Sequence, residues 1–356
     1  MSVTQRNGKI DFYKFVFSLV IVLHHARVLV GDAATYFLGG AFAVEFFFLV
    51  SGYLFMQSIR KQTAPAVRLG DETAAFLKRK FKGFFPEVLV AWVTGLVLLA
   101  VMARKNIVLE AVDTVFEVAL ADMSGLHIGS VNGVVWYLSS MLMCMAVLYP
   151  MVRKWPGMMM QVVVPLSVLL VFGRLCGNGM GTHGPRDWLG WTFKGNLRAY
   201  GEIGLGMCLY DPVQKLRSLE FSRFGRVTIS LAEHAIYIGI LLFCFFCGQS
   251  RRDFVFLSVL AVAVALSFTG KGADARLFDN RVCTALGRFS FPLFLSHRFL
   301  PESLQHVLPQ SMNSDLQILV YVVCSFITAF FVMGVSAYIR NNMPRWKQAA
   351  KKLFLA

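Results

Sequence analysis

Long apolar runs separated by short polar segments form the dominant pattern of this 356-residue chain. A helix needs roughly 20 mostly apolar residues to cross the hydrocarbon core of a bilayer. Ten runs approach or reach that length, which predicts an all-α, polytopic integral membrane protein with about ten transmembrane helices. The expected spans lie near residues 13–30, 38–57, 84–103, 133–152, 159–176, 197–211, 227–247, 253–270, 285–300 and 315–339.

The composition agrees with this class. Hydrophobic residues make up 56% of the chain, and the mean hydropathy is +0.60. A water-soluble domain would need a larger polar surface. The first apolar run lacks a small-residue cleavage site and ends in HHAR, so we expect a retained signal-anchor helix. We expect residues 1–356 to form one transmembrane domain.

The basic residues are distributed unequally between the two sides. With the N-terminus in the cytoplasm and ten crossings, 24 Lys and Arg residues fall on the inside and 6 on the outside. Because cytoplasmic loops carry an excess of Lys and Arg, this split predicts that both termini are cytoplasmic. The net charge of +15 then reflects topology. We therefore expect the protein to lie in a lipid bilayer and not to bind nucleic acid.

The cysteines do not indicate a metal site. Most of the seven lie inside apolar runs, and the Cys244–Cys247 pair has no second pair of ligands nearby. Cysteines in such runs commonly serve as small apolar residues inside membrane helices. We expect no bound metal.

The first span, FYKFVFSLVIVLHHA, carries ionisable residues. Such residues are costly in a membrane, which makes each a functional candidate. Lys14 and His25 lie about 20° apart on one helix face and about 16 Å apart along the axis, whereas His24 lies about 80° away from Lys14. A long thin ligand could lie along this helix face, with its anionic end at Lys14 and its reactive end at His25. The alternatives are a topological anchor for Lys14 and a structural hydrogen bond for the histidines.

The second span, GGAFAVEFFFLVSGYLF, places the carboxylate of Glu45 in an apolar setting. Paired with a histidine, this carboxylate would orient the ring and stabilise its protonated form, as in general-base catalysis. The small residues from Gly39 to Ala43, together with Gly52, allow close helix approach. We therefore expect contact between the second and first spans.

Three further segments contain polar candidates. The segment FLKRKFKGFFPEV is expected to be a cytoplasmic loop, with Pro86 at the start of the next helix. Its Lys78, Arg79, Lys80 and Lys82 fit either topology or the binding of phosphates or anionic lipid headgroups. Trp136 and Tyr137 fit an outer aromatic belt. His297 and Arg298 lie at the outer end of a late span.

These motifs together resemble the acyltransferase 3 family of bacterial integral-membrane acyltransferases. The resemblance rests on IDFYKFVFSLVIVLHHA, FAVEFFFLVSGYLF, LKRKFKGFFP, WYLSSMLMCMAVLYP and LGRFSFPLFLSH, in the family's order along nearly the whole chain. Three positions depart from the family pattern. Lys14 stands where the family has arginine, Glu45 where it usually has aspartate, and Gly83 where it often has arginine.

The resemblance implies transfer of an acyl group, usually acetyl, from cytoplasmic acyl-CoA to a hydroxyl of an envelope or exported glycan. It also implies a bacterial inner-membrane location and no permanently bound cofactor. The catalytic candidates are His25 and Glu45, and the candidates for binding acyl-CoA are Lys14, Arg79, Lys80 and Lys82. The candidates for substrate contact are His24, Ser51, Trp136, Tyr137 and His297.

In the mechanism that we expect, neutral His25 takes the proton of the acceptor hydroxyl while its oxygen attacks the thioester carbonyl. An acyl-enzyme on His25 or Ser51 is an alternative route. A membrane transporter and a non-catalytic partner in polysaccharide export are the alternative functions. The absence of paired halves and of corresponding broken helices in the sequence disfavours transport.

Overall fold

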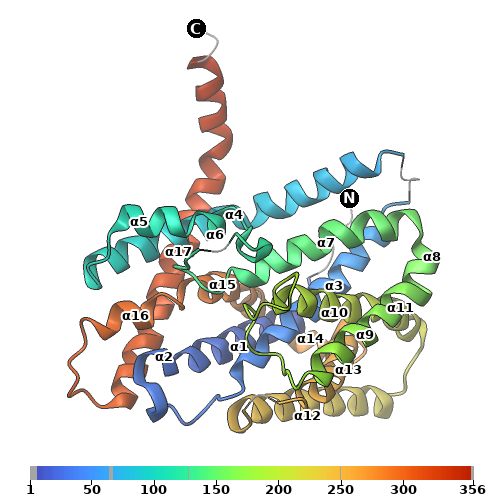
Figure 1. Cartoon of the computed structure of the whole chain (residues 1–356). Helices are drawn as coiled ribbons and strands as arrows, with labels where there is room; N and C mark the ends of the chain where they lie inside the picture. The colour runs from blue at the N-terminus through green and yellow to red at the C-terminus, as the bar shows by residue number, and fades with distance from the viewer. Residues whose placement is uncertain (1–5, 64–66, 127, 249, 354–356) are drawn as a thin grey trace.

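The computed structural model describes residues 6–63, 67–126, 128–248 and 250–353, with side chains described as far as Met343. These residues form helices and connecting loops, with an isolated antiparallel bridge between Trp188 and Phe193 (Figure 1). The helices are α1 Gly8–His25, α2 Arg27–Val30, α3 Val44–Arg60, α4 Leu69–Met102, α5 Ile107–Asp113, α6 Val115–Val118, α7 Trp136–Lys154, α8 Pro156–Met158, α9 Val164–Gly177, α10 Lys194–Cys208, α11 Tyr210–Ser218, α12 Arg223–Phe246, α13 Asp253–Thr269, α14 Ala275–Phe278, α15 Arg281–Ser296, α16 Leu300–Gln305 and α17 Ser314–Leu353. Three short 3₁₀ turns (Gly31–Ala33, Gly40–Ala43 and Asp122–Ser124) and a π-helical turn (Met159–Val163) complete the order.

A helix lies at each of the ten positions that the hydropathy pattern predicts. Within the described part of the chain, six helical segments are long and apolar enough to cross a membrane, and α13 is a shorter apolar helix. The six are Gly8–Ala33, Gly40–Arg60, Leu69–Met102, Pro156–Gly177, Arg223–Phe246 and Ser314–Met343. They support the all-α, multi-pass membrane class. The count of ten spans and the cytoplasmic placement of both termini stay predictions.

The basic segment before the third span is helical, so the expected loop is wrong. Residues 76–88 lie inside the 34-residue α4, with Pro86 in its interior. Lys, Arg and Leu favour helix, and Pro removes only one helical N–H donor. Arg340 of α17 donates to the Gly83 carbonyl at 2.8 Å and also forms an ion pair with Glu87. These contacts satisfy polar groups on both sides of the proline.

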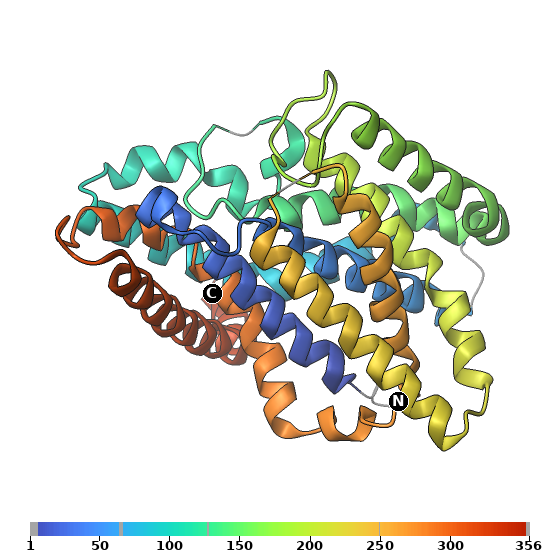
Figure 2. The same cartoon turned by 90° about the horizontal axis from the view of Figure 1, so that it is seen from below.

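Helix α1 lies in the middle of the bundle, alongside α12 and α15 (Figure 2). Gly287 of α15 permits the close approach to α1, because a Cβ at this position would lie 2.4 Å from Cβ of Asp11. On the α12 side, the rings of Tyr13 and Tyr237 stack with centroids 3.6 Å apart. The packing of both neighbours fixes the orientation of the α1 face that carries Lys14 and His25.

Two glycines hold α3 and α10 together. A Cβ at Gly52 would lie 2.2 Å from the Ile203 carbonyl oxygen, and a Cβ at Gly206 would lie 2.2 Å from that of Leu49. The expected contact with α1 is instead made by Gly40, where a Cβ would lie 2.6 Å from Cβ of His24. Gly52 therefore serves a different interface from the one expected. The close α3–α10 pair places two buried charged side chains opposite each other.

Candidate active site

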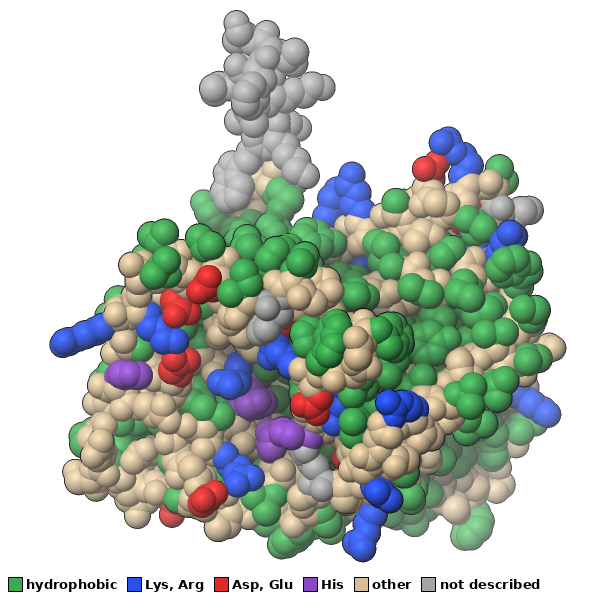
Figure 3. All heavy atoms as spheres, viewed as in Figure 1, with side chains coloured by type: hydrophobic (Ala, Val, Ile, Leu, Met, Phe, Trp, Pro, Cys, Tyr) green, Lys and Arg blue, Asp and Glu red, His purple; other side chains and the backbone are tan. Residues whose placement is uncertain are grey.

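A cavity of about 280 Å³ lies at the C-terminal end of α1. Its polar lining comes from α1, the loop before α7 and the first residue of α7, the loop before α10, α10, the turn after α15, and α16. The polar and aromatic lining residues are His24, His25, Ser130, Trp136, Thr182, His183, Arg186, Arg198, Phe294, Arg298 and Glu302. Figure 3 shows histidine, basic and acidic side chains gathered near the middle of one face of the molecule. We call this cavity the outer cavity.

His25 and His297 form a hydrogen-bonded pair at the outer cavity. His25 Nδ1 lies 2.9 Å from the Ile21 carbonyl oxygen and 3.3 Å from His297 Nε2. His297 Nδ1 lies 3.2 Å from the Leu293 carbonyl oxygen. Because a carbonyl oxygen only accepts, Nδ1 carries the hydrogen in both neutral rings. His25 Nε2 is then unprotonated, and it is the nitrogen that can act as a base.

His24 occupies a different part of the cavity wall. Its Nδ1 lies 2.8 Å from the Phe37 carbonyl oxygen, which places the hydrogen on that nitrogen as well. The ring centroids of His24 and His183 are 6.5 Å apart. Burial, followed by the charges of Arg198 and Lys194, lowers the pKa of His183 below its ordinary value. The neutral form of His183 is therefore favoured.

Glu45 does not pair with a histidine as expected. Within the described part of the chain, its hydrogen-bond partner is Arg198 of α10, which also lies 3.3 Å from Glu202 Oε1. All three side chains are at most 2% exposed. The Arg198 guanidinium also lies 5.2 Å from the Trp136 ring centroid. The close packing of α3 against α10 explains this outcome, because it aligns Glu45 with α10.

Ser51 and Tyr137 lie one layer away from the outer cavity and do not line it in the described structure. The Tyr137 hydroxyl donates to the Phe47 carbonyl at 3.1 Å and lies 2.9 Å from Ser51 Oγ. The Tyr137 ring also packs against Phe294, whose side chain does line the cavity. The predicted substrate contacts are thus separated: Trp136 lines the cavity, while Tyr137 and Ser51 support its wall.

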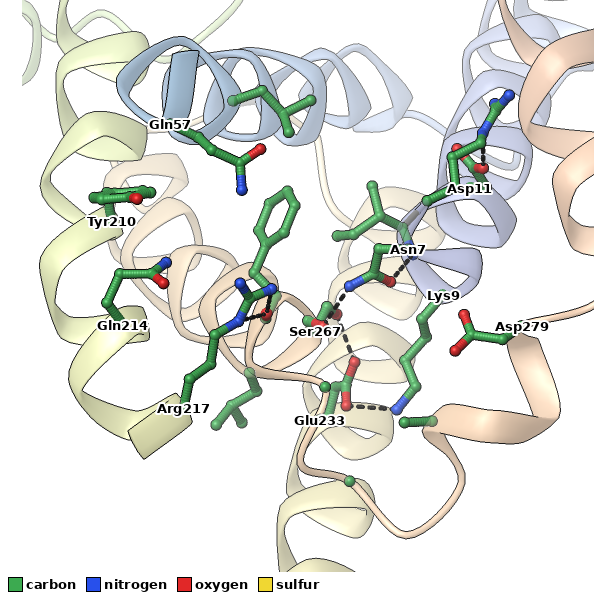
Figure 4. A pocket seen from close by; sticks show the side chains of 18 of the residues that line it. Asn7, Lys9, Asp11, Gln57, Tyr210, Gln214, Arg217, Glu233, Ser267 and Asp279 are labelled. Atoms are coloured by element: carbon green, nitrogen blue, oxygen red, sulfur yellow. Dashed lines mark hydrogen bonds and ion pairs between the residues drawn. The ribbon is translucent and has the colours of Figure 1, made fainter. Parts of the chain in front are cut away.

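A larger cavity of about 1100 Å³ lies at the opposite end of α1, among α3 and α11–α14 (Figure 4). Its basic lining residues are Arg6, Lys9, Lys14, Lys61, Arg217 and Arg276. Lys14 Nζ lies 3.4 Å from Asp11 Oδ1, and its side chain is 25% exposed. Lys14 and His25 therefore face two separate cavities, about 16 Å apart along one helix. We call the larger one the inner cavity.

The expected phosphate-binding cluster on α4 lies apart from the inner cavity. The described lining residues do not include Arg79, Lys80 or Lys82. Arg79 and Lys82 are exposed, and Lys80 is half-buried with its ammonium 5.9 Å from the Phe76 ring centroid. Lys80 and Lys14 are close enough to repel each other electrostatically. Of these three residues, only Lys80 is thus shown to interact electrostatically with a residue that lines the inner cavity, namely Lys14.

A buried network forms one wall of the inner cavity. Lys9 Nζ lies 2.7 Å from Glu233 and 2.9 Å from Asp274, and His234 Nε2 lies 2.6 Å from Asp274. Burial opposes ionisation of Asp274, but hydrogen bonds from Ser230, Lys9 and His234 and the charge of Lys9 lower its pKa overall. Asp274 therefore stays ionised and holds the N-terminus of α1 against α12.

We expect Asp274→Asn to lower the free energy of unfolding by about 2–3 kcal/mol, because Lys9 loses a charged partner while still buried. A carboxylate with a lowered folded-state pKa stabilises above its unfolded pKa of about 3.9, and that contribution disappears as the pH falls through the folded value. The difference from wild type should thus persist between pH 8 and 5 and shrink below about pH 4. Thermal unfolding in detergent measures it. Asp211→Asn, at an exposed ion pair with Arg60, is the control.

Several site residues were not among the sequence candidates. Arg198 and Arg186 are far from His25 in the sequence. They line the same cavity as His25 only because distant segments of the chain pack together. The sequence predicts Lys61, Arg217 and Arg276 to be cytoplasmic charges and gives them no further role. A partial signal existed for Arg198, because it is an arginine at the edge of a predicted span.

The arrangement is a multi-pass helical bundle with two polar cavities, one at each end of α1, and a pair of histidines at one of them. A family model described as "Acyltransferase domain" matches residues 7–338, nearly the whole chain, so the protein belongs to this acyltransferase family. The match confirms the resemblance that the sequence motifs indicate. No curated protein and no solved structure was found to match. The protein is a membrane acyltransferase.

Proposed function

We propose that the protein moves an acyl group, in the simplest case acetyl, from acyl-CoA in the inner cavity to a hydroxyl of a glycan in the outer cavity. The observation that carries this proposal is the placement of Lys14 and His25 in two cavities along one face of α1. The donor and acceptor would then approach the reacting atoms from opposite sides of a cell's inner membrane.

The inner cavity suits the donor because CoA carries several phosphates. Positively charged side chains with free donors bind phosphate strongly. Among the lining residues, Lys61 and Arg276 are exposed, and Lys14 makes one long contact to Asp11. The narrow pantetheine arm would extend from these residues along α1 towards His25. Lys80 would add charge near Lys14, whereas Arg79 and Lys82 would act at the cavity's periphery.

The transfer step uses the free Nε2 of His25. This nitrogen takes the proton of the acceptor hydroxyl as the oxygen bonds to the thioester carbon. The C–S bond then breaks, and the CoA thiolate takes the proton back from His25. His297 would orient the ring of His25 through Nδ1. Arg198 would supply positive charge to the carbonyl oxygen as its negative charge develops. Glu45 would act as a positioning residue for Arg198.

Binding of the donor tests this proposal. We expect Lys14→Met to raise the Kd for acetyl-CoA about 10-fold, because a charge-assisted hydrogen bond to phosphate is lost. Isothermal titration in nanodiscs measures the Kd, and succinyl-CoA serves as a second donor. Lys154→Met, at an exposed residue outside the cavity, is the control. Lys82→Met should change the Kd less than Lys14→Met. Failure of wild type to bind either donor would contradict acyl-CoA dependence.

A further inference from the structure

The charged residues of the outer cavity are paired, with one exception. Arg198 contacts Glu45 and Glu202, and Arg186 Nη2 lies 2.7 Å from Asp122 Oδ2. Glu302 Oε1 lies 2.6 Å from Lys105. Among the residues that the structure describes, none forms a hydrogen bond or an ion pair with the guanidinium of Arg298. Arg298 therefore contributes a positive charge that no neighbouring carboxylate neutralises directly.

This charge lies close to the reacting groups. Arg298 directly follows His297 in the chain, and the electrostatic effect of its guanidinium reaches both His297 and His25. A second guanidinium lies beside it: Arg186 donates to the Gly133 carbonyl at 3.2 Å. A Cβ built at Gly133 would lie 3.5 Å from Cγ and 3.7 Å from Nε of Arg298. Two arginines thus lie next to one residue of the cavity wall, Gly133.

The charges of Glu302 and Glu117 act on the Arg298 guanidinium from a distance, while that of Arg186 opposes them. A half-buried guanidinium without a directly bonded partner is still unfavourable, because it has lost part of its hydration without gaining hydrogen bonds in return. A bound anion would compensate for that loss, and the planar fork of arginine matches a carboxylate or a phosphate. The histidines beside Arg298 are not anionic and cannot fill this role. The hydrogen-bond donors of Arg298 that could bind an anion therefore lie on its cavity side.

We propose that Arg298, supported by Arg186, binds an anionic group of the substrate, a carboxylate or a phosphate, beside His25. This inference rests on the proposed function. The anion could belong to the acceptor, as in an acidic sugar, or to the acyl group itself, as in a succinyl chain. In either case Arg298 determines specificity by holding the charged group while His25 acts on the reacting atoms.

The acceptor arm of the test measures binding without any donor. Methyl β-D-glucuronide and glucose 1-phosphate are the charged probes, and methyl β-D-glucoside is the neutral probe, all at equal ionic strength. A ligand that binds the folded state raises its unfolding temperature. We expect the charged probes to raise that of wild type and of Arg288→Gln, and Arg298→Gln to lose the shift. Arg288 is a matched control because it is an exposed arginine on α15, the helix that precedes Arg298, and does not line the outer cavity.

The donor arm compares the KM and kcat of succinyl-CoA and acetyl-CoA hydrolysis. If the anion belongs to the acyl group, wild type has the lower KM for succinyl-CoA, and Arg298→Gln raises that KM about 10- to 100-fold. Arg298→Lys, which keeps the charge and loses the fork, should retain part of the preference. It also serves if Arg298→Gln does not fold.

The proposal is overturned if wild type treats charged and neutral probes alike in both arms. It is also overturned if Arg298→Gln keeps the discrimination, because the anion would then bind elsewhere. These results leave the proposed function intact as long as acetyl-CoA still binds the inner cavity. Loss of acetyl-CoA binding in wild type would instead contradict the proposed function, and the acceptor arm would still decide the role of Arg298.

Discussion

Replacing His25 with alanine is expected to lower kcat for acyl transfer by about 10²–10⁴-fold, the usual contribution of a general acid–base. The reason is that Nδ1 of His25 carries the ring hydrogen, because it faces the Ile21 carbonyl oxygen and His297. Nε2 is therefore unprotonated in the neutral ring and can accept a proton. CoA release in the presence of acceptor measures kcat, and isothermal titration measures donor binding. Donor binding should change little, because Lys14 and the inner cavity are intact.

His306→Ala is the control for this experiment. His306 is an exposed histidine whose Nδ1 lies 2.8 Å from the Glu302 carbonyl oxygen, and it does not line the outer cavity. The His306→Ala variant should retain the wild-type kcat. His24→Ala provides a second comparison, because it removes a neighbouring ring that contacts Phe37. Equal losses in His24→Ala and His25→Ala would count against a specific role for His25 as the base.

The largest expected effect on stability comes from Arg198→Met. This change leaves Glu45 and Glu202 buried without their positive partner, and breaking a buried pair from one side typically costs about 3–5 kcal/mol. We expect a much lower unfolding temperature in detergent and a reduced yield of folded protein. Thermal unfolding followed by circular dichroism measures this loss.

A compensating variant separates the charge effect from the loss of packing. Adding Glu45→Gln and Glu202→Gln to Arg198→Met removes the uncompensated charges, so the triple variant should be more stable than the single one. Arg60→Met, at an exposed pair with Asp211, should change stability by less than about 1 kcal/mol. A triple variant no more stable than Arg198→Met would show that packing on Trp136, rather than charge, dominates.

The sequence predicts the parts of the fold that depend on local pattern. Apolar runs of sufficient length give the positions of the helices, and the 100° helical increment places Lys14 and His25 on one face of α1. The resemblance extends that prediction to the enzyme class, which the family match confirms. The prediction from local sequence pattern is wrong at residues 76–88, where the basic residues and Pro86 indicate a loop but the chain is helical. There, a contact from Arg340, more than 250 residues away, supports a continuous helix.

The composition of the site depends on packing between distant segments, which sequence spacing does not reveal. Glu45 has Arg198 as its partner because Gly52 and Gly206 bring α3 and α10 together. Without that contact, a nearby histidine is the reasonable expectation. The separation of Lys14 and His25 into two cavities likewise depends on which helices cover each end of α1. The catalytic role of His25 stays a prediction.

The most direct test of the account is acyl transfer across sealed, inside-out membrane vesicles. Labelled acyl-CoA is added only to the outside of the vesicles, which is the cytoplasmic face, and glycan acceptor is enclosed in the lumen. The account predicts labelled product in the lumen with wild type and almost none with His25→Ala, at equal amounts of folded protein. Equal lumenal product from both proteins would contradict the role of His25. Product formed only on the cytoplasmic face would contradict transfer between the two cavities.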